Sequence, residues 1–359
     1  MPHCRARDCQ NTVWLPLHNS APHKIERGLG TMKLKILTFS LILILLLSGC
    51  AGPVPGSDDE NPPPVTDQDD LQKDAPELDG DCVKIRFFTV EGIENWGDCT
   101  YIEFPNGENM MIDTGLSSAA QIIADDLLDQ GIDHIDHLVL SHSHNDHVDG
   151  VTDILTYMSV KHAYSADYFT TEYQSIIRDL KNQGADHTTI RAGSSFDVGD
   201  VHFDVLWPSD ERCSGELTQT SASSSAGNCS VEYQNGCSVL MKMTYGETSA
   251  LFTGDLYTSH DAMVMKYLGD NVAVLDSDVL KIPHHGYNNA SSPVFIKAIS
   301  PTYAVSMGTH VMNSTTYEAY TDANCTCYFS WMNGNVYVYM NGTDVLAVPD
   351  NDTVSDYYQ

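Results

Sequence analysis

Residues 138–150 read LVLSHSHNDHVDG, in which an apolar run leads directly into a cluster of imidazole and carboxylate side chains. The cluster consists of His142, His144, Asp146 and His147. The apolar run is typical of a short buried strand, and the four side chains can converge on a metal ion only if the chain turns into a loop after it. Neutral imidazole and carboxylate are the usual ligands of zinc-like ions, so we favour a metal site over a solvated polar turn.

Three other fragments also follow expected strands and carry side chains suited to such a site. Asp113 begins DTG and could orient a ligand histidine from behind, and Asp255 ends TGD and could bridge two ions. His284 and His285 are adjacent imidazoles in KIPHHG. An aspartate at a strand end is more often a turn or helix cap, so each fragment alone is weak. Their shared placement favours a single site.

The surrounding sequence predicts alternating strands and helices. We expect strands over 83–90, 100–104, 110–112, 137–140, 160–163, 238–244, 250–253, 279–282 and 303–306, helices over 117–130, 171–182 and 259–268, a hairpin over 334–348 and a long exposed loop over 209–236. Hairpin-paired strands interleaved with helices predict a layered α/β domain with mixed sheets.

The order of these motifs resembles the metallo-β-lactamase superfamily. The fuller patterns GDCTYIEFPNGENMMIDTG, LVLSHSHNDHVDG, CSVLMKMTYGETSALFTGD and VLKIPHHGYNNASS are similar to the hydrolase domain of ComEC-type competence proteins and to the phosphorylcholine esterase branch. The resemblance covers roughly residues 82–308. It implies a four-layer αββα sandwich with two divalent metal ions, usually Zn²⁺, with Mn²⁺ as the alternative.

The resemblance also implies roles for individual residues. The first ion would be held by His142 and His144, the second by Asp146, His147 and His285, and both by Asp255. We take Asp146, Asp255 and His284 as the catalytic group, with His284 near the ligands or against substrate. Water activated between two cations would then attack phosphorus or a carbonyl carbon.

The sequence departs from the superfamily pattern in two places. A histidine common between the first motif and the bridging aspartate is absent, because the region reads EYQNGCSVL with Gln234 and Asn235. We therefore expect a more open first metal position. A Gly-His-Pro tripeptide after the last core strand is also absent, and His310 could replace it as a proton donor or be an ordinary surface histidine.

Polar residues after HHG have two interpretations. Asn289, Ser291 and Ser292 could hydrogen-bond a phosphate, or they could cap a helix, which is the commoner role of such residues.

The first 80 residues are typical of a targeting signal and a linker rather than a folded domain. Residues 32–50 read MKLKILTFSLILILLLSGC, with a short basic start, an apolar run too short to span a bilayer, and a small-residue end at Cys50. We expect a lipoprotein signal with Cys50 lipidated, so the mature chain would be extracytoplasmic and anchored to a bacterial membrane by lipid alone. The full division is a mis-assigned extension over 1–31, the signal over 32–50, an acidic Pro-rich tether over 51–80, the hydrolase domain over 81–350 and a tail over 351–359.

The charge balance narrows the substrate class. The chain has 18 Lys and Arg against 49 Asp and Glu, with no basic cluster in the domain to follow a phosphate backbone. We expect a small or cell-envelope phosphodiester or related ester, and long nucleic acid is disfavoured by charge although the resemblance keeps it open. The alternatives are a non-catalytic binding lipoprotein with a degenerate site, and a lactone or β-lactam hydrolase. Among ten cysteines, Cys213 and Cys229 are the first guess for a disulfide.

Overall fold

The computed structural model describes residues 78, 80–90, 92–93, 96–166, 171–209, 230–308, 312 and 314–351. The expected signal, Cys50, His310 and the Cys213–Cys229 pair lie outside these residues. Cys237 is disulfide-bonded, whereas the four other cysteines in the described part are free thiols. No helix in the described ranges is long and apolar enough to cross a membrane.

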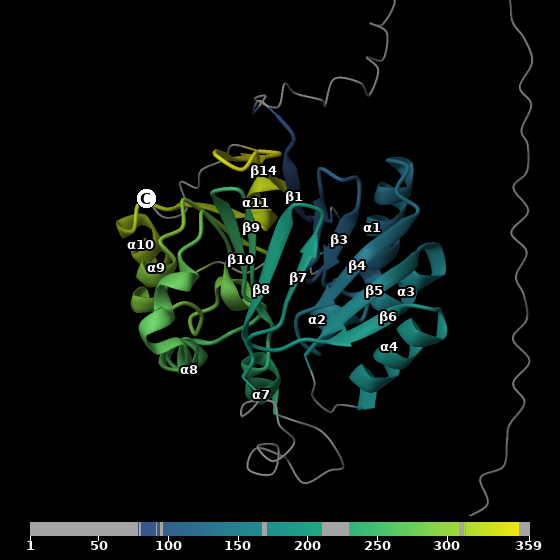
Figure 1. Ribbon diagram of the computed structural model, residues 1–359, viewed down its shortest axis with the longest axis horizontal. Helices are drawn as coiled ribbons and strands as arrows, with labels where there is room; N and C mark the ends of the chain where they lie inside the picture. The colour runs from purple at the N-terminus through teal and green to yellow at the C-terminus, as the bar shows by residue number, and fades with distance from the viewer. Residues whose placement is uncertain are drawn as a thin grey trace, which may run out of the picture. The chain divides into compact units, whose positions relative to one another are not determined.

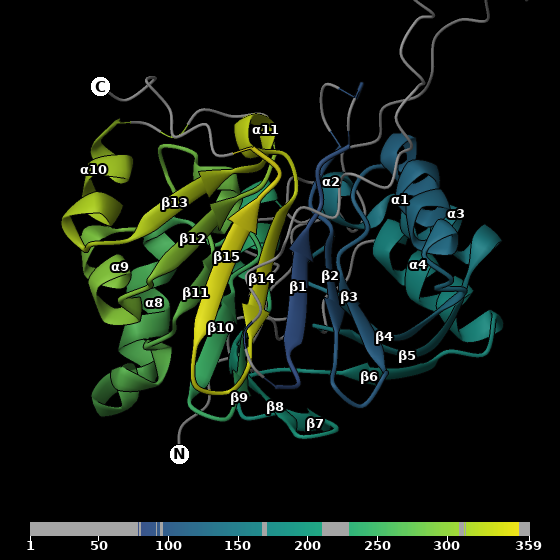
Figure 2. The same cartoon turned by 90° about the horizontal axis from the view of Figure 1, so that it is seen from above.

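Two sheets pack face to face in the centre of the domain (Figures 1 and 2). The eight-stranded sheet contains, in spatial order, β15 (Val345–Pro349), β14 (Val336–Met340), β1 (Val83–Phe87), β2 (Thr100–Glu103), β3 (Asn109–Ile112), β4 (His134–Leu140), β5 (Ser159–Ser165) and β6 (Asp186–Thr189). The seven-stranded sheet contains β13 (Thr326–Phe329), β12 (Tyr303–Ser306), β11 (Val279–Lys281), β10 (Thr248–Phe252), β9 (Leu240–Tyr245), β8 (Val201–Trp207) and β7 (Ser195–Val198).

Helices cover the outer face of each sheet (Figure 2). The first sheet carries α1 (Ser117–Asp129), α3 (Val151–Tyr157) and α4 (Thr171–Asn182), and the second carries α8 (Thr258–Leu268), α9 (Pro293–Ile299) and α10 (Ser314–Asp322). Shorter helices are α2 (Asn145–Val148), α7 (Val231–Gly236) and α11 (Ser330–Asn333), with 3-10 turns over Gly269–Leu275 and Pro283–Gly286. This arrangement confirms the predicted four-layer αββα sandwich.

Both sheets are mixed, as the sequence predicted. Strands β1, β2 and β3 pair antiparallel, and β3, β4, β5 and β6 pair parallel. In the second sheet β10 to β13 pair parallel, and β7 to β10 pair antiparallel. The parallel strand β4 is buried along almost its whole length because sheet and helices cover both of its faces. One hydrophobic cluster fills the space between the two sheets and beneath α1, α3 and α4, and a second lies between the seven-stranded sheet and its helices.

Most predicted elements are present, with boundaries that move by one to three residues. The exposed loop predicted over 209–236 is wrong at its end, because Val231–Gly236 forms α7. Ser230 caps this helix by accepting a hydrogen bond from the backbone N–H of Tyr233, whose ring is buried. The indole of Trp207 also donates to the carbonyl of Gly236 at 2.7 Å, so tertiary contacts hold a turn that composition alone assigned to solvent.

Candidate metal centre

The candidate ligands and the supporting Asp113 lie on loops at the carboxyl ends of four strands. Parallel pairing places Ile112 of β3 beside Val139 of β4, and Leu251 of β10 beside Leu280 of β11. The loops that follow each pair therefore leave the sheet at the same edge, which is where open α/β sheets generally bind ligands. This topology brings together motifs that are far apart in the sequence.

The structure groups the predicted ligands into two clusters. One contains His142, His144 and Asp255, and the other contains Asp146, His147, Asp255 and His285. Within each cluster the ligand atoms lie within 4.8 Å of one another. Asp255 belongs to both clusters, so its carboxylate is placed between two potential ion positions.

The first cluster is built on the turn after β4. Nε2 of His142 lies 3.1 Å from Nδ1 of His144 and 3.8 Å from Oδ2 of Asp255. The hydroxyl of Ser141 lies 3.0 Å from Nδ1 of His142 and fixes the ring from behind. Two imidazole nitrogens this close, with a carboxylate facing them, form a donor set that suits a divalent cation.

The second cluster is more acidic and more deeply enclosed. Nε2 of His147 lies 3.3 Å from Oδ1 of Asp255, and Nε2 of His285 lies 3.3 Å from Oδ2 of the same carboxylate. Nε2 of His285 also lies 3.2 Å from Oδ2 of Asp146. Two carboxylates and two imidazoles converge here, and that donor set again fits a divalent ion.

Each histidine of the second cluster is oriented by a buried carboxylate on its other nitrogen. Nδ1 of His147 lies 2.7 Å from Oδ2 of Asp113, as the sequence suggested. Nδ1 of His285 lies 3.0 Å from Oδ1 of Asp98, a residue for which the sequence gave no role. A carboxylate on Nδ1 leaves Nε2 to bind a metal, which is the arrangement that usually supports metal-binding histidines.

Burial and charge govern protonation at these groups. Burial lowers the pKa of His142 and of His144, and nearby imidazoles add to this effect. Burial would also lower the pKa of His147 and His285, but Asp255 together with Asp113 or Asp98 holds both well above the ordinary value. The pKa of Asp255 is held well below its ordinary range by His285, His147 and Lys281 despite its burial. The carboxylates that favour imidazolium would equally favour a divalent cation.

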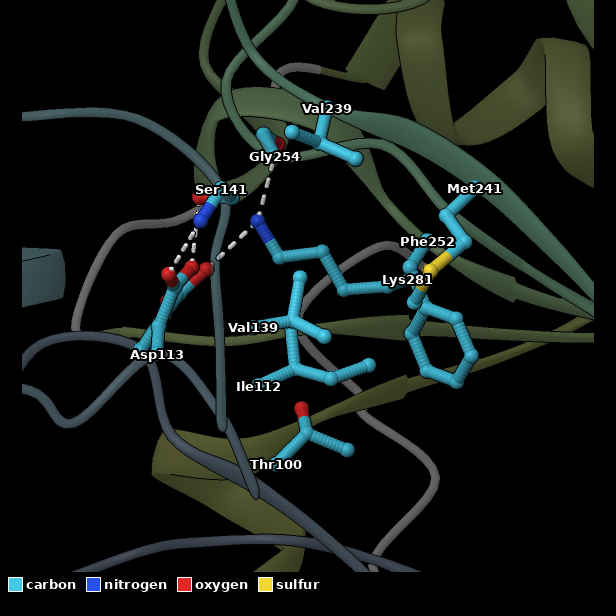
Figure 3. A pocket seen from close by; sticks show the side chains of 11 residues that line it. Thr100, Ile112, Asp113, Val139, Ser141, Val239, Met241, Phe252, Gly254 and Lys281 are labelled. Atoms are coloured by element: carbon cyan, nitrogen blue, oxygen red, sulfur yellow. Dashed lines mark hydrogen bonds and ion pairs between the residues drawn. The ribbon is translucent and has the colours of Figure 1, made fainter. Parts of the chain in front are cut away.

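Lys281 lies directly behind the ligands, with its side chain 5% exposed. Figure 3 shows its ammonium at the polar end of a cavity between the two sheets, near the carbonyl of Gly254. The apolar part of the cavity is lined by Ile112, Val139, Val239, Met241 and Phe252. The charge of Lys281 is therefore shielded from solvent and faces the acidic side of the centre.

His284 lies beside the clusters but is not part of either. Its Nδ1 lies 2.7 Å from Oδ1 of Asn289, which can only accept, so Nδ1 carries the proton and Nε2 of the neutral ring has the lone pair. The rings of Tyr257 and Tyr287 lie 4.6 and 4.7 Å from the imidazole, centroid to centroid. Burial lowers the pKa of His284.

The polar residues after HHG divide between the two interpretations. Ser292 caps α9 by accepting from the backbone N–H of Phe295, so the capping role is confirmed for this residue. Asn289 contacts His284 instead, and the hydroxyl of Ser291 lies 2.7 Å from that of Tyr320 in the core. The structure therefore brings Asn289 to the centre and directs Ser291 away from it.

The backbone of the centre is strained at three non-glycine positions. Asp113, His284 and His285 have φ values of 60°, 44° and 53°, in the left-handed region that favours glycine. Such conformations cost on the order of 1–3 kcal/mol each and persist where surrounding contacts require them. Their concentration at these loops indicates that ligand direction takes precedence over local backbone preference.

The segment expected to supply a third histidine forms α7. The side chain of Gln234 hydrogen-bonds the hydroxyl of Ser143, between two first-cluster histidines in sequence. Asn235 is fully buried, and its side chain lies near the hydroxyl of Tyr257. Amide groups therefore occupy the segment where the resemblance would place an imidazole.

Comparison with known proteins identifies the domain. The family model of the metallo-beta-lactamase superfamily matches residues 97–202, so the chain contains a metallo-beta-lactamase domain. Members of this superfamily are mostly metal-dependent hydrolases, and the fold usually binds divalent metals.

Particular relatives include competence proteins. The chain is 30% identical over 199 residues to Competence protein ComA of Neisseria gonorrhoeae, covering 55% of this chain and 23% of the relative. It is 23% identical over 228 residues to ComE operon protein 3 of Bacillus subtilis, covering 58% and 26%. The chain thus spans about a quarter of the length of these relatives. The metallo-beta-lactamase fold protein YhfI of Bacillus subtilis aligns with 10% identity and a TM-score of 0.44, covering 75% of this chain and 100% of that one.

Two supporting residues were not predicted from the sequence. Asp98 precedes β2, and Ser141 directly follows β4, where its hydroxyl lies 2.6 Å from Oδ2 of Asp113. The sequence feature that could have indicated a role for Asp98 is its position, a charged residue between Gly97 and the apolar start of a buried strand. A charged residue in such a position requires a buried partner, and the sequence does not say which one.

Proposed function

We propose that the chain is a metal-dependent hydrolase that cleaves a small phosphodiester or related ester at a binuclear centre. The observation that carries this proposal is the position of Asp255, whose carboxylate faces histidines of both ligand clusters. A carboxylate shared in this way would supply a ligand to each of the two ions of a hydrolytic two-metal site. His142 and His144 would hold one ion, and Asp146, His147 and His285 would hold the other.

The ions would supply one kind of chemistry. Divalent ions, most simply Zn²⁺ or Mn²⁺, lower the pKa of water and offset the negative charge that develops during ester hydrolysis. The chain's own groups orient the ligands through Asp98 and Asp113 and surround the ligands with buried side chains. Nε2 of His284 carries the lone pair and would accept a hydrogen bond from the attacking water or the substrate, since Asn289 holds the protonated Nδ1.

Charge supports a small substrate over a long polyanion. The formal net charge of the chain is -31. Among the described residues, the basic side chain that contacts the centre is Lys281, and it is buried. A nucleic-acid backbone would find no exposed basic track beside these ligands. The printed names of the relatives refer to competence, so DNA is retained as the second substrate class to be assayed.

The same proposal includes the cellular location of the enzyme. We infer from the sequence over 32–50 that Cys50 is lipidated and that the domain acts outside the cytoplasmic membrane. The acidic segment over 51–80 would then separate the domain from the membrane surface. The substrate would be a small cell-envelope or extracellular ester, which can bind beside buried ligands without a basic groove.

The test is metal content and turnover measured on the full-length chain. Elemental analysis after loading should give about two ions per chain, and bis-p-nitrophenyl phosphate should be hydrolysed in a chelator-sensitive manner. Parallel assays with p-nitrophenyl phosphorylcholine, single-stranded DNA and nitrocefin assign the substrate class. A chain that holds no stoichiometric metal and hydrolyses none of them is a binding protein, and the proposal is then wrong.

A further inference from the structure

Lys281 connects the two halves of the metal centre through one buried ammonium. Its Nζ lies 2.5 Å from Oδ2 of Asp98, 2.9 Å from the carbonyl oxygen of Gly254 and 3.4 Å from Oδ1 of Asp255. Gly254 and Asp255 accept hydrogen bonds from the ammonium, and Asp98 pairs with it as a close counter-ion. The ammonium therefore contacts Asp98, which orients the ligand His285, and Asp255, which is the ligand shared by both clusters.

The contacts form a closed ring around the second cluster. Lys281 holds Asp98, Asp98 holds Nδ1 of His285, and Nε2 of His285 faces Oδ2 of Asp255. Oδ1 of Asp255 leads back to Lys281 at 3.4 Å. Each carboxylate in the ring thus has one oxygen on the lysine and the other toward a histidine of the centre.

Apolar side chains surround the stem of Lys281 and separate its ammonium from solvent. Its stem runs beside Val139, Met241 and Phe252, which exclude water from the ammonium (Figure 3). A buried charge is tolerated only when it is paired and hydrogen-bonded, so the position of the ammonium fixes the positions of its partners. Asp98 itself is 2% exposed, and the ammonium of Lys281 is its nearest charged partner.

We propose that Lys281 is a positioning residue of the metal centre, which holds Asp98 and Asp255 so that His285 and the shared carboxylate are placed for an ion before it arrives. The inference rests on the metal centre that the proposed function also requires. Loss of the ammonium would release Asp98, and His285 would lose its orientation. A simple electrostatic effect has the opposite sign, because removing a cation beside the site would strengthen attraction for a metal ion.

The test is zinc affinity of the full-length chain, measured by competition with a chromophoric chelator and without any substrate. Lys281→Met keeps the length of the side chain and should bind one of the two ions about 10–100-fold more weakly, the usual cost of losing an outer partner of a metal ligand. Lys242→Met is the matched control, because Lys242 in the neighbouring strand β9 bonds only to the carbonyls of Val274 and Asp276. Its zinc affinity should equal that of the unaltered chain.

A double-mutant cycle separates positioning from general stabilisation. If Lys281 acts through His285, Lys281→Met should cost little further affinity in a His285→Ala background. Affinity that is unchanged or tighter in Lys281→Met, or losses that are fully additive with His285→Ala, would overturn the inference.

Folding is controlled by a second variant. Lys281→Met leaves the buried Asp98 without its ammonium partner, so the double change Lys281→Met with Asp98→Asn removes both charges together. This variant should fold and still bind the second ion weakly, and full affinity in it would contradict the positioning role. Because no substrate is used, a failure of every ester assay leaves this result interpretable, and an unaltered chain without zinc refutes the centre itself.

Discussion

Oδ1 of Asp98 lies 3.0 Å from Nδ1 of His285, and Oδ2 of Asp113 lies 2.7 Å from Nδ1 of His147. The two contacts make the second ligand cluster nearly symmetric, with one buried carboxylate behind each imidazole. They come from opposite ends of the chain's first two hairpin strands, since Asp98 precedes β2 and Asp113 follows β3. Antiparallel pairing of those strands brings the two aspartates to the same edge.

Asp113→Asn should weaken binding of one metal ion about 10–100-fold while the domain stays folded. The amide can no longer hold His147 with a charged acceptor, so the ring orientation that presents Nε2 is less favoured. Zinc titration against a chelator measures the change. Asp136→Asn is the control, because Asp136 is an equally buried carboxylate that pairs with Lys161 and Asn109 away from the centre. Equal weakening in both variants would assign the effect to general destabilisation.

Asp255→Ala should abolish metal-dependent turnover and reduce the number of bound ions. The loss should exceed the roughly 10–100-fold cost of an outer partner, because both clusters lose a ligand at once. Elemental analysis and bis-p-nitrophenyl phosphate hydrolysis measure the two effects. Asp344→Ala, at an exposed turn, should change neither. Full activity in Asp255→Ala would rule out a two-metal mechanism.

Gly97→Ala should destabilise the domain and disturb the metal centre together. A Cβ at Gly97 would lie 2.1 Å from the backbone oxygen of Asp146, so the ligand loop would have to move. Gly92 is the matched control, since its φ of 79° is close to the 75° of Gly97 but a Cβ there meets nothing within 4 Å. We expect urea unfolding to show a loss about 1–3 kcal/mol larger for Gly97→Ala, the usual cost of overpacking. Equal losses would mean that only φ matters.

Asp261→Asn should stabilise the domain at high pH and not at low pH. Burial raises the pKa of Asp261 to about 7, although the backbone N–H of Ser292 donates to its Oδ2 at 2.7 Å. The folded state therefore binds a proton more tightly than the unfolded state does. This favours folding below the ordinary carboxyl pKa, and stability falls as the pH rises toward 7.

Asparagine keeps the acceptor for Ser292 and has no charge to bury. The gain above pH 7 should be at most about 4 kcal/mol, from a shift of roughly three pKa units. Urea unfolding at pH 4 and pH 8 measures it. The same difference between the two chains at both values of pH would show that ionisation of Asp261 does not limit stability.

Much of the fold could be read from local patterns. The strand 303–306 and the helix 171–182 were predicted with the bounds that the structure gives, because their apolar periodicity and end signals lie within the segment itself. The prediction was wrong for Val231–Gly236, where the contacts of Tyr233 and Trp207 decide the conformation. Polar composition could not reveal those contacts.

The sequence by itself determined the ligand types and the strand-end loops that carry them, because both are encoded in short contiguous motifs such as HSHNDH and PHHG. Only the tertiary structure decided that Asp98 orients His285 and that Lys281 joins Asp98 to Asp255. Asp98 lies more than 150 residues from both His285 and Lys281 and is carried by the other sheet, and burial makes each charge depend on the others. A buried charge shows in the sequence only as an isolated polar residue, whereas its partner is chosen by the packing of the sheets.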